Sequence, residues 1–245
     1  MKNLVKASVL LCAILGFAAC NNDNGEPVYS IYDEPAVVES VGELPVIRTP
    51  YGKYSVPSLA SVSLEQGSLL WVAFTVDMND QPNQEVPNAQ NFKYIEIDST
   101  QATMPADVTE FEACLSDSYS DSIEVAMLYN TYIDEMLFFK FTQKAADDQK
   151  FTYELICNPA VENGEDVPTL YIRAKKVDAE NAPTAKASTE KNTVFGIKMS
   201  NYISYYKEKF SGTVKFNLKY KTGTDKDGKD IYKAFKSNPI VWDVK

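Results

Sequence analysis

Residues 214–220 read Val-Lys-Phe-Asn-Leu-Lys-Tyr, and apolar side chains alternate there with polar ones. A period of two places every second side chain on the same face of a β-strand, so this stretch predicts a strand with one buried face. Residues 151–157, FTYELIC, and residues 170–175, LYIRAK, show the same alternation. Residues 69–78, LLWVAFTVDM, form a longer run rich in residue types that favour strands. Together these stretches predict an all-β fold.

The two halves of the chain differ in how often turns interrupt the strands. Most prolines lie before residue 110 and cut that half into short strands, which is typical of a small barrel. The second half has longer strands and polar loops, which is typical of an antiparallel β-sandwich. We therefore predict an OB-like barrel over residues 36–104 and a β-sandwich over residues 105–245. One continuous β-domain is the alternative.

The first twenty residues carry the pattern of an export signal. Lys2 and Lys6 precede an apolar stretch, residues 7–17, and two alanines then precede Cys20. That stretch is too short to span a bilayer, which takes about 20 residues. We predict a signal peptide over residues 1–19 and, from the polar residues that follow, a flexible tether over residues 20–35.

The tetrad Phe17-Ala18-Ala19-Cys20 resembles the lipobox of bacterial lipoproteins, although that family prefers Leu at the first position. The resemblance implies that Cys20 becomes the first mature residue and carries lipid that anchors the chain to a membrane. Asn21 stands where an Asp would resemble an inner-membrane retention signal, so the outer membrane is expected, with the face undecided. A plain secreted protein is the alternative.

Composition excludes several kinds of function. The chain holds 24 Lys and Arg against 34 Asp and Glu, which argues against a nucleic-acid partner. It has no histidine, which removes Ser-His-Asp and Cys-His catalysis and His-based zinc sites. Neighbouring carboxylates on a strand point to opposite faces and would not share a cleft; such pairs are Asp33-Glu34, Asp134-Glu135 and Asp147-Asp148. We expect no catalytic residue, metal or cofactor.

Two cysteines remain after the leader and the lipid site are set aside. Cys114 and Cys157 would meet an oxidising compartment after export, so they are candidates for a disulfide. The alternative is two separate buried thiols. Cys157 alternates with Phe151, Tyr153 and Leu155, which indicates that it points into the core.

Two further clusters have a structural and a functional interpretation. Residues 222–230 contain Asp225, Asp227 and Asp230, as a calcium loop would, but the closing Glu of an EF-hand is missing. We favour a hairpin turn there, with Gly223 and Gly228 at positive φ. Two groups of tyrosines either stack on sugar rings from an exposed face or fill the sandwich core and its rim; they are Tyr202, Tyr205 and Tyr206, and Tyr129 and Tyr132. We also expect a hairpin turn at Asp134-Glu135 and a short helix between Met199 and Lys209.

The order of these segments resembles the NigD-like lipoproteins of Gram-negative anaerobes. The resemblance rests on Cys20 with its polar tether and on a series of strand patterns: residues 67–76 (GSLLWVAFTV), 121–125 (DSIEV), 132–141 (YIDEMLFFKF), 195–200 (FGIKMS) and 214–220 (VKFNLKY). It implies an N-terminal OB-like barrel, a C-terminal β-sandwich and an outer-membrane location, and it transfers no catalytic residue. It also implies a link to bacteriocin gene clusters.

These observations predict a non-catalytic binding or interaction module of the cell envelope. A protein partner bound through loops and edge strands is expected. A glycan- or ligand-binding accessory lipoprotein, an immunity-like role and a hydrolase are the alternatives. The sequence leaves the ligand and the oligomeric state open.

Overall fold

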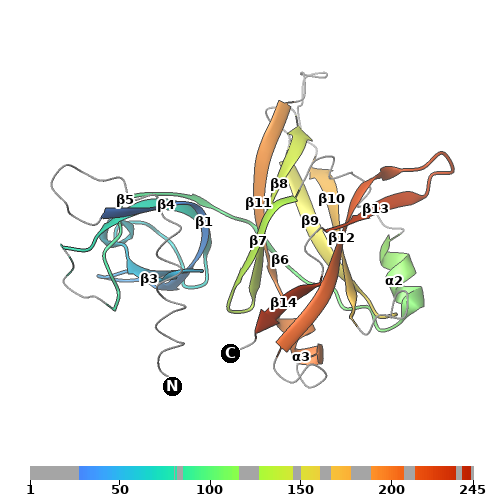
Figure 1. The fold of residues 1–245 in the computed structure, drawn as a ribbon, viewed down its shortest axis with the longest axis horizontal. Helices are drawn as coiled ribbons and strands as arrows, with labels where there is room; N and C mark the ends of the chain where they lie inside the picture. Colours follow the sequence, from blue (N-terminus) through green and yellow to red (C-terminus); the bar gives the residue numbers. More distant parts are fainter. Residues whose placement is uncertain are drawn as a thin grey trace, which may run out of the picture. The chain divides into compact units, whose positions relative to one another are not determined.

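The computed structural model describes residues 28–79, 81, 85–115, 127–145, 150–160, 167–177, 189–206, 213–235 and 239–243. The chain divides into two compact units, one that ends at Ile97 and one that begins at Asp98. Both consist mainly of β-strands, which confirms the all-β fold class (Figure 1). The predicted signal peptide and Cys20 lie outside the described residues.

The first unit is a five-stranded antiparallel sheet whose two edges meet. The strand order is β3-β2-β1-β4-β5, with the bounds β1 (Val28–Ser40), β2 (Val46–Thr49), β3 (Gly52–Ser55), β4 (Leu69–Asp77) and β5 (Gln90–Glu96). A parallel bridge between Ser55 and Asn88 joins β3 to the residues before β5. The Ser55 N–H donates to the Pro87 carbonyl at 3.0 Å, and the Ser55 carbonyl accepts from the Ala89 N–H at 2.8 Å. This is the OB-like barrel that the sequence predicts.

The alternation read from residues 69–78 places the barrel core. Leu70, Val72, Phe74 and Val76 of β4 point inward and are almost fully buried, together with Ile47 of β2. A short 3-10 helix, η1 (Pro57–Leu59), follows β3 and adds Leu59 to this core. Burial of these apolar side chains is the main force that holds the barrel.

Two sequence-based boundaries differ from the structure. Residues 28–35, expected in the tether, form the first part of β1, because Val28 to Val37 pair with β4 from Asp77 to Leu69. The division between units lies after Ile97 rather than after Met104. The reason is long-range pairing: β6 (Ser99–Gln101) pairs with β11, far along the chain.

The second unit has two sheets. One has the order β13-β12-β10-β9, with β14 paired to β12, and the other has the order β6-β11-β8-β7. The remaining bounds are β7 (Met127–Ile133), β8 (Met136–Ala145), β9 (Lys150–Asn158), β10 (Thr169–Val177), β11 (Thr189–Lys198), β12 (Thr213–Thr224), β13 (Asp230–Ala234) and β14 (Ile240–Asp243). Thr103 bridges the sheets through hydrogen bonds with Leu155 and Cys157 of β9. Most neighbouring strands are antiparallel as predicted, but β10–β12 and β6–β11 are parallel. Between β10 and β12 the chain passes through β11, which belongs to the other sheet.

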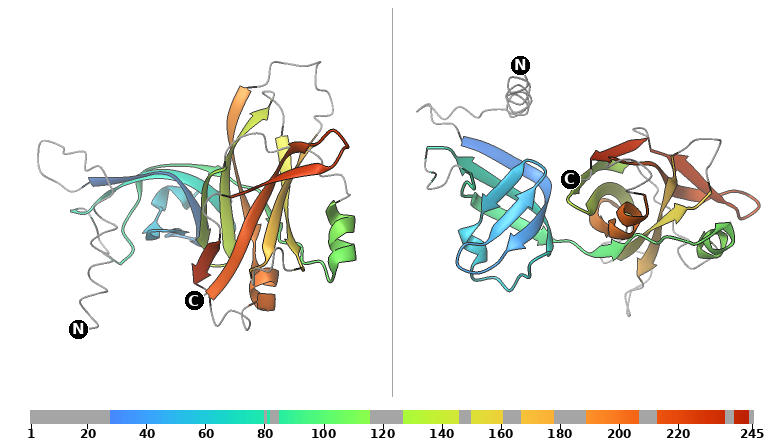
Figure 2. Two further views of the ribbon diagram at one scale, coloured as in Figure 1. Left: turned by 45° about the vertical axis from the view of Figure 1, so that its right-hand side comes forward. Right: turned by 90° about the horizontal axis from the view of Figure 1, so that it is seen from below.

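An aromatic stack fills the interior between these two sheets. Phe141 of β8 and Phe195 of β11 stack on Tyr153 of β9, with the Tyr153 and Phe195 ring centroids 4.2 Å apart. Phe139 of β8 stacks in turn on Phe141 and Phe195. Figure 1 and Figure 2 show α3 (Ser200–Tyr206) at the lower end of this unit, where it lies over the opening of the ring of strands seen from below. This helix lies where the sequence predicts one, and its Tyr202, Ile203 and Tyr206 side chains are buried.

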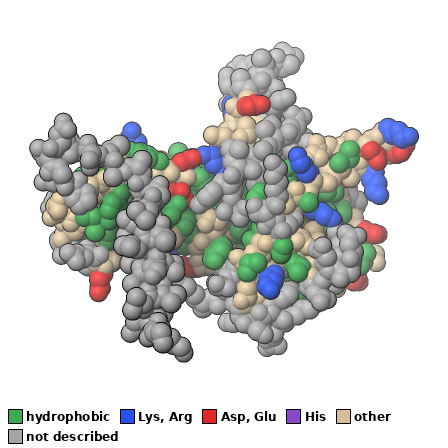
Figure 3. All heavy atoms as spheres, viewed as in Figure 1, with side chains coloured by type: hydrophobic (Ala, Val, Ile, Leu, Met, Phe, Trp, Pro, Cys, Tyr) green, Lys and Arg blue, Asp and Glu red, His purple; other side chains and the backbone are tan. Residues whose placement is uncertain are grey.

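Three features lie outside this interior. The helix α2 (Val108–Leu115), which the sequence analysis does not predict, packs on the outer face of β9 and β10 through Phe111. The predicted hairpins at Asp134-Glu135 and at residues 222–230 are both present. Charged side chains of both signs gather at the tip of the β12–β13 hairpin (Figure 3). In the described part of the chain, no helix combines the length and apolar character needed to cross a membrane.

Candidate functional site

An open depression of about 540 Å³ lies on the first unit, at the seam where β3 approaches β5. Its lining comes from the start of η1 and from the residues that lead into β5: Pro57, Ser58, Asn88, Ala89, Gln90, Asn91, Phe92 and Lys93. The volume lies within the range of small-molecule sites. Three amide side chains, one hydroxyl and one ammonium surround it, and no carboxylate belongs to the lining.

A β-bulge shapes this depression. Ala73 pairs with Lys93 but Thr75 pairs with Gln90, so β5 holds one extra residue opposite β4. Asn91 is at the bulge and has φ of 52°, a left-handed conformation that Asn tolerates better than most residues. As a result the adjacent side chains of Gln90 and Asn91 are both exposed, which a regular strand would not allow.

Hydrogen bonds hold the residues around the depression. The Asn91 amide nitrogen donates to Thr75 Oγ1 at 3.0 Å. The Asn88 N–H donates to Gln81 Oε1 at 2.5 Å, and the Gln81 amide nitrogen donates to the Asp77 carbonyl, so Gln81 links the two ends of the β4–β5 loop. These bonds connect the residues around the depression to β4 and to Gln81.

One aromatic ring, that of Phe92, belongs to the lining beside the amides. The Phe92 ring is half-buried, and its centroid lies 5.9 Å from the Phe74 ring and 5.9 Å from the Tyr94 ring. Ser55, on the bridge next to the depression, is buried, and its hydroxyl has no hydrogen-bond partner among the described residues. Amide, hydroxyl and aromatic groups in one concave place suit a ligand rich in hydroxyl groups.

A charged cluster lies on the outer face of β1 to β3 in the same unit. The Glu39 carboxylate binds both Arg48 and Lys53, the latter at 2.6 Å. Burial opposes the charged form of Glu39, but the hydrogen bonds from Lys53 and Arg48 outweigh it and lower the pKa of this carboxyl. Cross-strand pairs of this kind are common on antiparallel sheets, so we interpret the cluster as structural.

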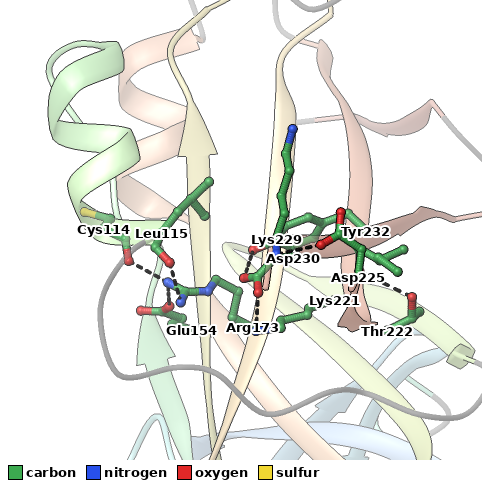
Figure 4. Close-up of polar contacts among 11 residues, drawn as sticks. Cys114, Leu115, Glu154, Arg173, Lys221, Thr222, Asp225, Lys229, Asp230 and Tyr232 are labelled. Carbon is green, nitrogen blue, oxygen red and sulfur yellow. Dashed lines mark hydrogen bonds and ion pairs between the residues drawn. The ribbon is translucent and has the colours of Figure 1, made fainter. Parts of the chain in front are cut away.

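The second unit carries a different set of charges, which lie in a row across four strands (Figure 4). Glu154 of β9 pairs with Arg173 of β10 at 2.9 Å, and Lys221 of β12 pairs with Asp230 of β13 at 2.5 Å. The Arg173 and Lys221 side chains are 1% and 2% exposed. We call these four residues the charge ladder.

Arg173 also attaches α2 to the sheet. Its guanidinium donates to the carbonyls of Cys114 and Leu115, at 2.5 and 2.8 Å, at the end of the helix where carbonyls lack intrahelical donors. Burial raises the pKa of Tyr232, whose hydroxyl donates to Asp230 at 3.3 Å. Each charge in the ladder has an opposite charge beside it, so the ladder is a structural element rather than an open binding site.

The two candidate disulfide cysteines are not bridged. Cys114 lies on α2, outside the sheet, whereas Cys157 of β9 points into the interior of the second unit. Because they lie on opposite sides of β9, the sulfur atoms cannot meet. Burial raises the pKa of the Cys157 thiol to about 11, despite a contact with the Tyr206 hydroxyl at 3.8 Å. This supports the alternative of two separate thiols, and the raised pKa disfavours the reactive thiolate form of Cys157.

The other candidate residues are divided between the core and the surface. Tyr202 and Tyr206 are core residues, and the Tyr202 hydroxyl donates to the Lys215 carbonyl at 2.8 Å; Tyr205 is 70% exposed. They therefore do not form an exposed aromatic face. Tyr132 is exposed beside the 134–135 turn, and the Tyr129 side chain lies outside the description.

The aspartates of residues 222–230 hold a turn, as the structural interpretation predicts. The Asp225 carboxylate accepts from the N–H groups of Asp227 and Lys229, and Gly228 has φ of 80°. Gly223 does not have the predicted positive φ, because it lies within β12 at a register shift. Among the described residues, no three acidic or cysteine side chains are grouped as a metal site requires.

The described residues of the carboxylate pairs also have structural roles. Asp33, at φ of 63° in a bulge of β1, accepts from Trp71 Nε1 at 2.7 Å, and Glu34 accepts from the Tyr51 hydroxyl at 3.1 Å. Asp134 and Glu135 form the turn between β7 and β8, and Asp147 and Asp148 lie outside the described residues.

Two features of the structure were not predicted from the sequence. The helix α2 has a recognisable start: the Glu110 N–H donates to the Asp107 carboxylate at 2.9 Å, and the Glu110 carboxylate accepts from the Ala106 N–H at 2.7 Å. The spacing Asp-x-x-Glu is a capping signal that was readable in the sequence. The amides of residues 88–91 carried no such signal, because a polar run before a strand is typical of any loop.

Comparison with solved structures shows several proteins with this fold. An uncharacterized protein from Parabacteroides merdae superposes with a TM-score of 0.62 at 16% identity, over 88% of this chain and 100% of its own. A NigD-like immunity protein from Bacteroides caccae gives 0.56 at 10% identity, over 87% and 96%. A protein described as a lipoprotein, from Bacteroides fragilis, gives 0.55 at 13% identity, over 89% and 98%.

No family model matches the sequence. No curated protein matches it either. At such low identities the structural likeness shows a shared two-unit β fold, found also in a NigD-like protein and in a protein described as a lipoprotein.

Proposed function

We propose that this chain is an outer-membrane lipoprotein, anchored through lipid on Cys20, that acts as a non-catalytic binding module of the cell envelope. The export signal and the residues around Cys20 support the anchor. The fold shared with a protein described as a lipoprotein supports the same assignment. Membership of the NigD-like proteins is part of this proposal, supported by the strand order and by the shared fold.

The depression at the β3–β5 seam is the observation that carries the binding role. It combines a concave shape, a bulge that exposes neighbouring amides, and a lining without carboxylates. Bulges occur often beside functional sites, where they redirect side chains. A binding role fits it better than catalysis, because the lining offers donors and acceptors but no paired acid and base.

The candidate binding roles differ in the kind of partner that they require. We expect an envelope protein held by exposed loops; Val41 and Leu44, in the β1–β2 loop, are exposed apolar side chains of the kind that such contacts use. The depression favours a glycan ligand as the second candidate. An immunity-like role is supported by the description of the protein from B. caccae and by the resemblance to the NigD-like lipoproteins.

Palmitate labelling with cell fractionation tests the anchor. We expect the wild-type chain to incorporate label and to fractionate with the outer membrane, and Cys20→Ala to lose both properties. Protease added to intact cells then separates the faces: degradation places the protein on the surface, and protection places it on the periplasmic side. A wild-type chain that takes up no label would overturn the lipoprotein proposal.

A further inference from the structure

The depression has a charge opposite to that of the unit around it. Between residues 28 and 97 the basic residues are Arg48, Lys53 and Lys93, and they are outnumbered by acidic residues. Arg48 and Lys53 both bind Glu39. Lys93 lies on the depression, is exposed, and has no ion pair with any residue that the structure describes. The depression is thus a positively charged place on an acidic barrel.

The neutral groups beside Lys93 define the rest of a ligand. Asn88, Gln90 and Asn91 each offer an amide, which both donates and accepts hydrogen bonds, and Ser58 offers a hydroxyl. Planar amides can bond two neighbouring hydroxyl groups of one sugar ring. The apolar side of such a ring can contact the half-buried Phe92.

We propose that this depression binds an acidic oligosaccharide, that is, a sugar chain that carries carboxylates. Lys93 pairs with a carboxylate, while the amides and Ser58 bind hydroxyl groups. The absence of carboxylates from the lining fits an anionic ligand, because a like charge in the site would repel it. This inference deepens the binding role proposed above and does not depend on the lipid anchor.

Isothermal titration of the full chain in detergent tests the proposal with two probes, hexagalacturonate and the neutral hexasaccharide maltohexaose. We expect hexagalacturonate to bind more tightly than maltohexaose. Lys93→Gln should weaken the affinity for hexagalacturonate about tenfold, since one charge-assisted hydrogen bond is lost. Lys53→Gln is the matched control, because Lys53 is an exposed lysine of the same barrel outside the depression. It should leave the affinity unchanged.

Asn91→Gly separates the amide from the backbone conformation. Glycine accepts φ of 52° without strain, so the bulge should persist while the amide is lost. We expect weaker binding of both probes. The melting temperature should change little, because the lost hydrogen bond from Asn91 to Thr75 is exposed. The proposal is overturned if hexagalacturonate does not bind, if maltohexaose binds equally well, or if Lys93→Gln and Lys53→Gln behave alike. Because titration is done on purified protein, such a failure is distinct from a failure of palmitate labelling.

Discussion

Arg48 and Arg173 are the two arginines of the chain, and one lies in each unit. Arg48 binds Glu39 on the outside of the barrel, where its side chain is 31% exposed. Arg173 binds Glu154 and two helix carbonyls beneath α2, where its side chain is 1% exposed. The same residue type thus makes a solvated cross-strand pair in one unit and a buried anchor in the other.

This difference bears on where the proposed ligand could bind. The barrel leaves polar side chains exposed around a bulge, where a ligand can reach them. The second unit pairs each of its two buried cations with a partly buried carboxylate and fills its interior with stacked rings. Buried polar groups that already have partners stabilise a fold but have little capacity left for a ligand.

Removing each arginine in turn gives the largest expected contrast. Arg173→Ala leaves Glu154 without its cation and two α2 carbonyls without donors, so we expect a loss of about 3–5 kcal/mol in the free energy of unfolding. Arg48→Ala should cost at most about 1 kcal/mol, because its pair is solvated and Glu39 keeps Lys53. Urea unfolding followed by peptide-level hydrogen exchange measures each unit separately. Equal costs in the two units would contradict the distinction.

Two tyrosines test the interior of the second unit. The Tyr153 hydroxyl donates to Gln143 Oε1 at 2.6 Å, and both side chains are buried. Tyr153→Phe leaves this buried amide oxygen without that donor, so we expect a loss of about 1–3 kcal/mol in thermal or urea unfolding. Tyr205→Phe is the control, since Tyr205 is 70% exposed and should change stability by less than about 0.5 kcal/mol. A neutral Tyr153→Phe would show that the hydrogen bond adds nothing there.

The smallest expected effect is a loss of barrel stability in acid, caused by protonation of Glu39. Its pKa is lower in the folded state than the ordinary value of 4.5, so Glu39 is protonated at a lower pH when folded than when unfolded. The stabilisation is complete above that ordinary value and is lost as the pH falls through the folded pKa. We expect a loss of at most about 1 kcal/mol for the barrel below about pH 4.5. Glu39→Gln should reduce that slope, measured by melting from pH 7 to pH 3; an unchanged slope would assign it to other groups.

The sequence predicted what depends on local pattern. Alternation at residues 151–157 and 214–220 placed strands with the correct buried faces, and Asp134-Glu135 marked a real hairpin. Long-range pairing was not readable. The pairing of Ser99 with Gly196 moves the unit boundary, and neither local sequence indicates it.

The sites show the same limit. The alternation in residues 170–175 put Arg173 on the outward face, but nothing nearby indicated that α2 covers that face. Ser58 and Lys93 lie far apart in the sequence, but both line the depression because the chain closes the barrel between β3 and β5.

Hydrogen exchange of the full chain, with and without hexagalacturonate, tests most directly whether the barrel is the binding unit. We predict that the ligand slows exchange at Ser58 and in residues 88–93 and leaves β9, β10 and the β12–β13 hairpin unchanged. Slower exchange in the second unit, or in neither unit, would contradict the assignment of binding to the barrel.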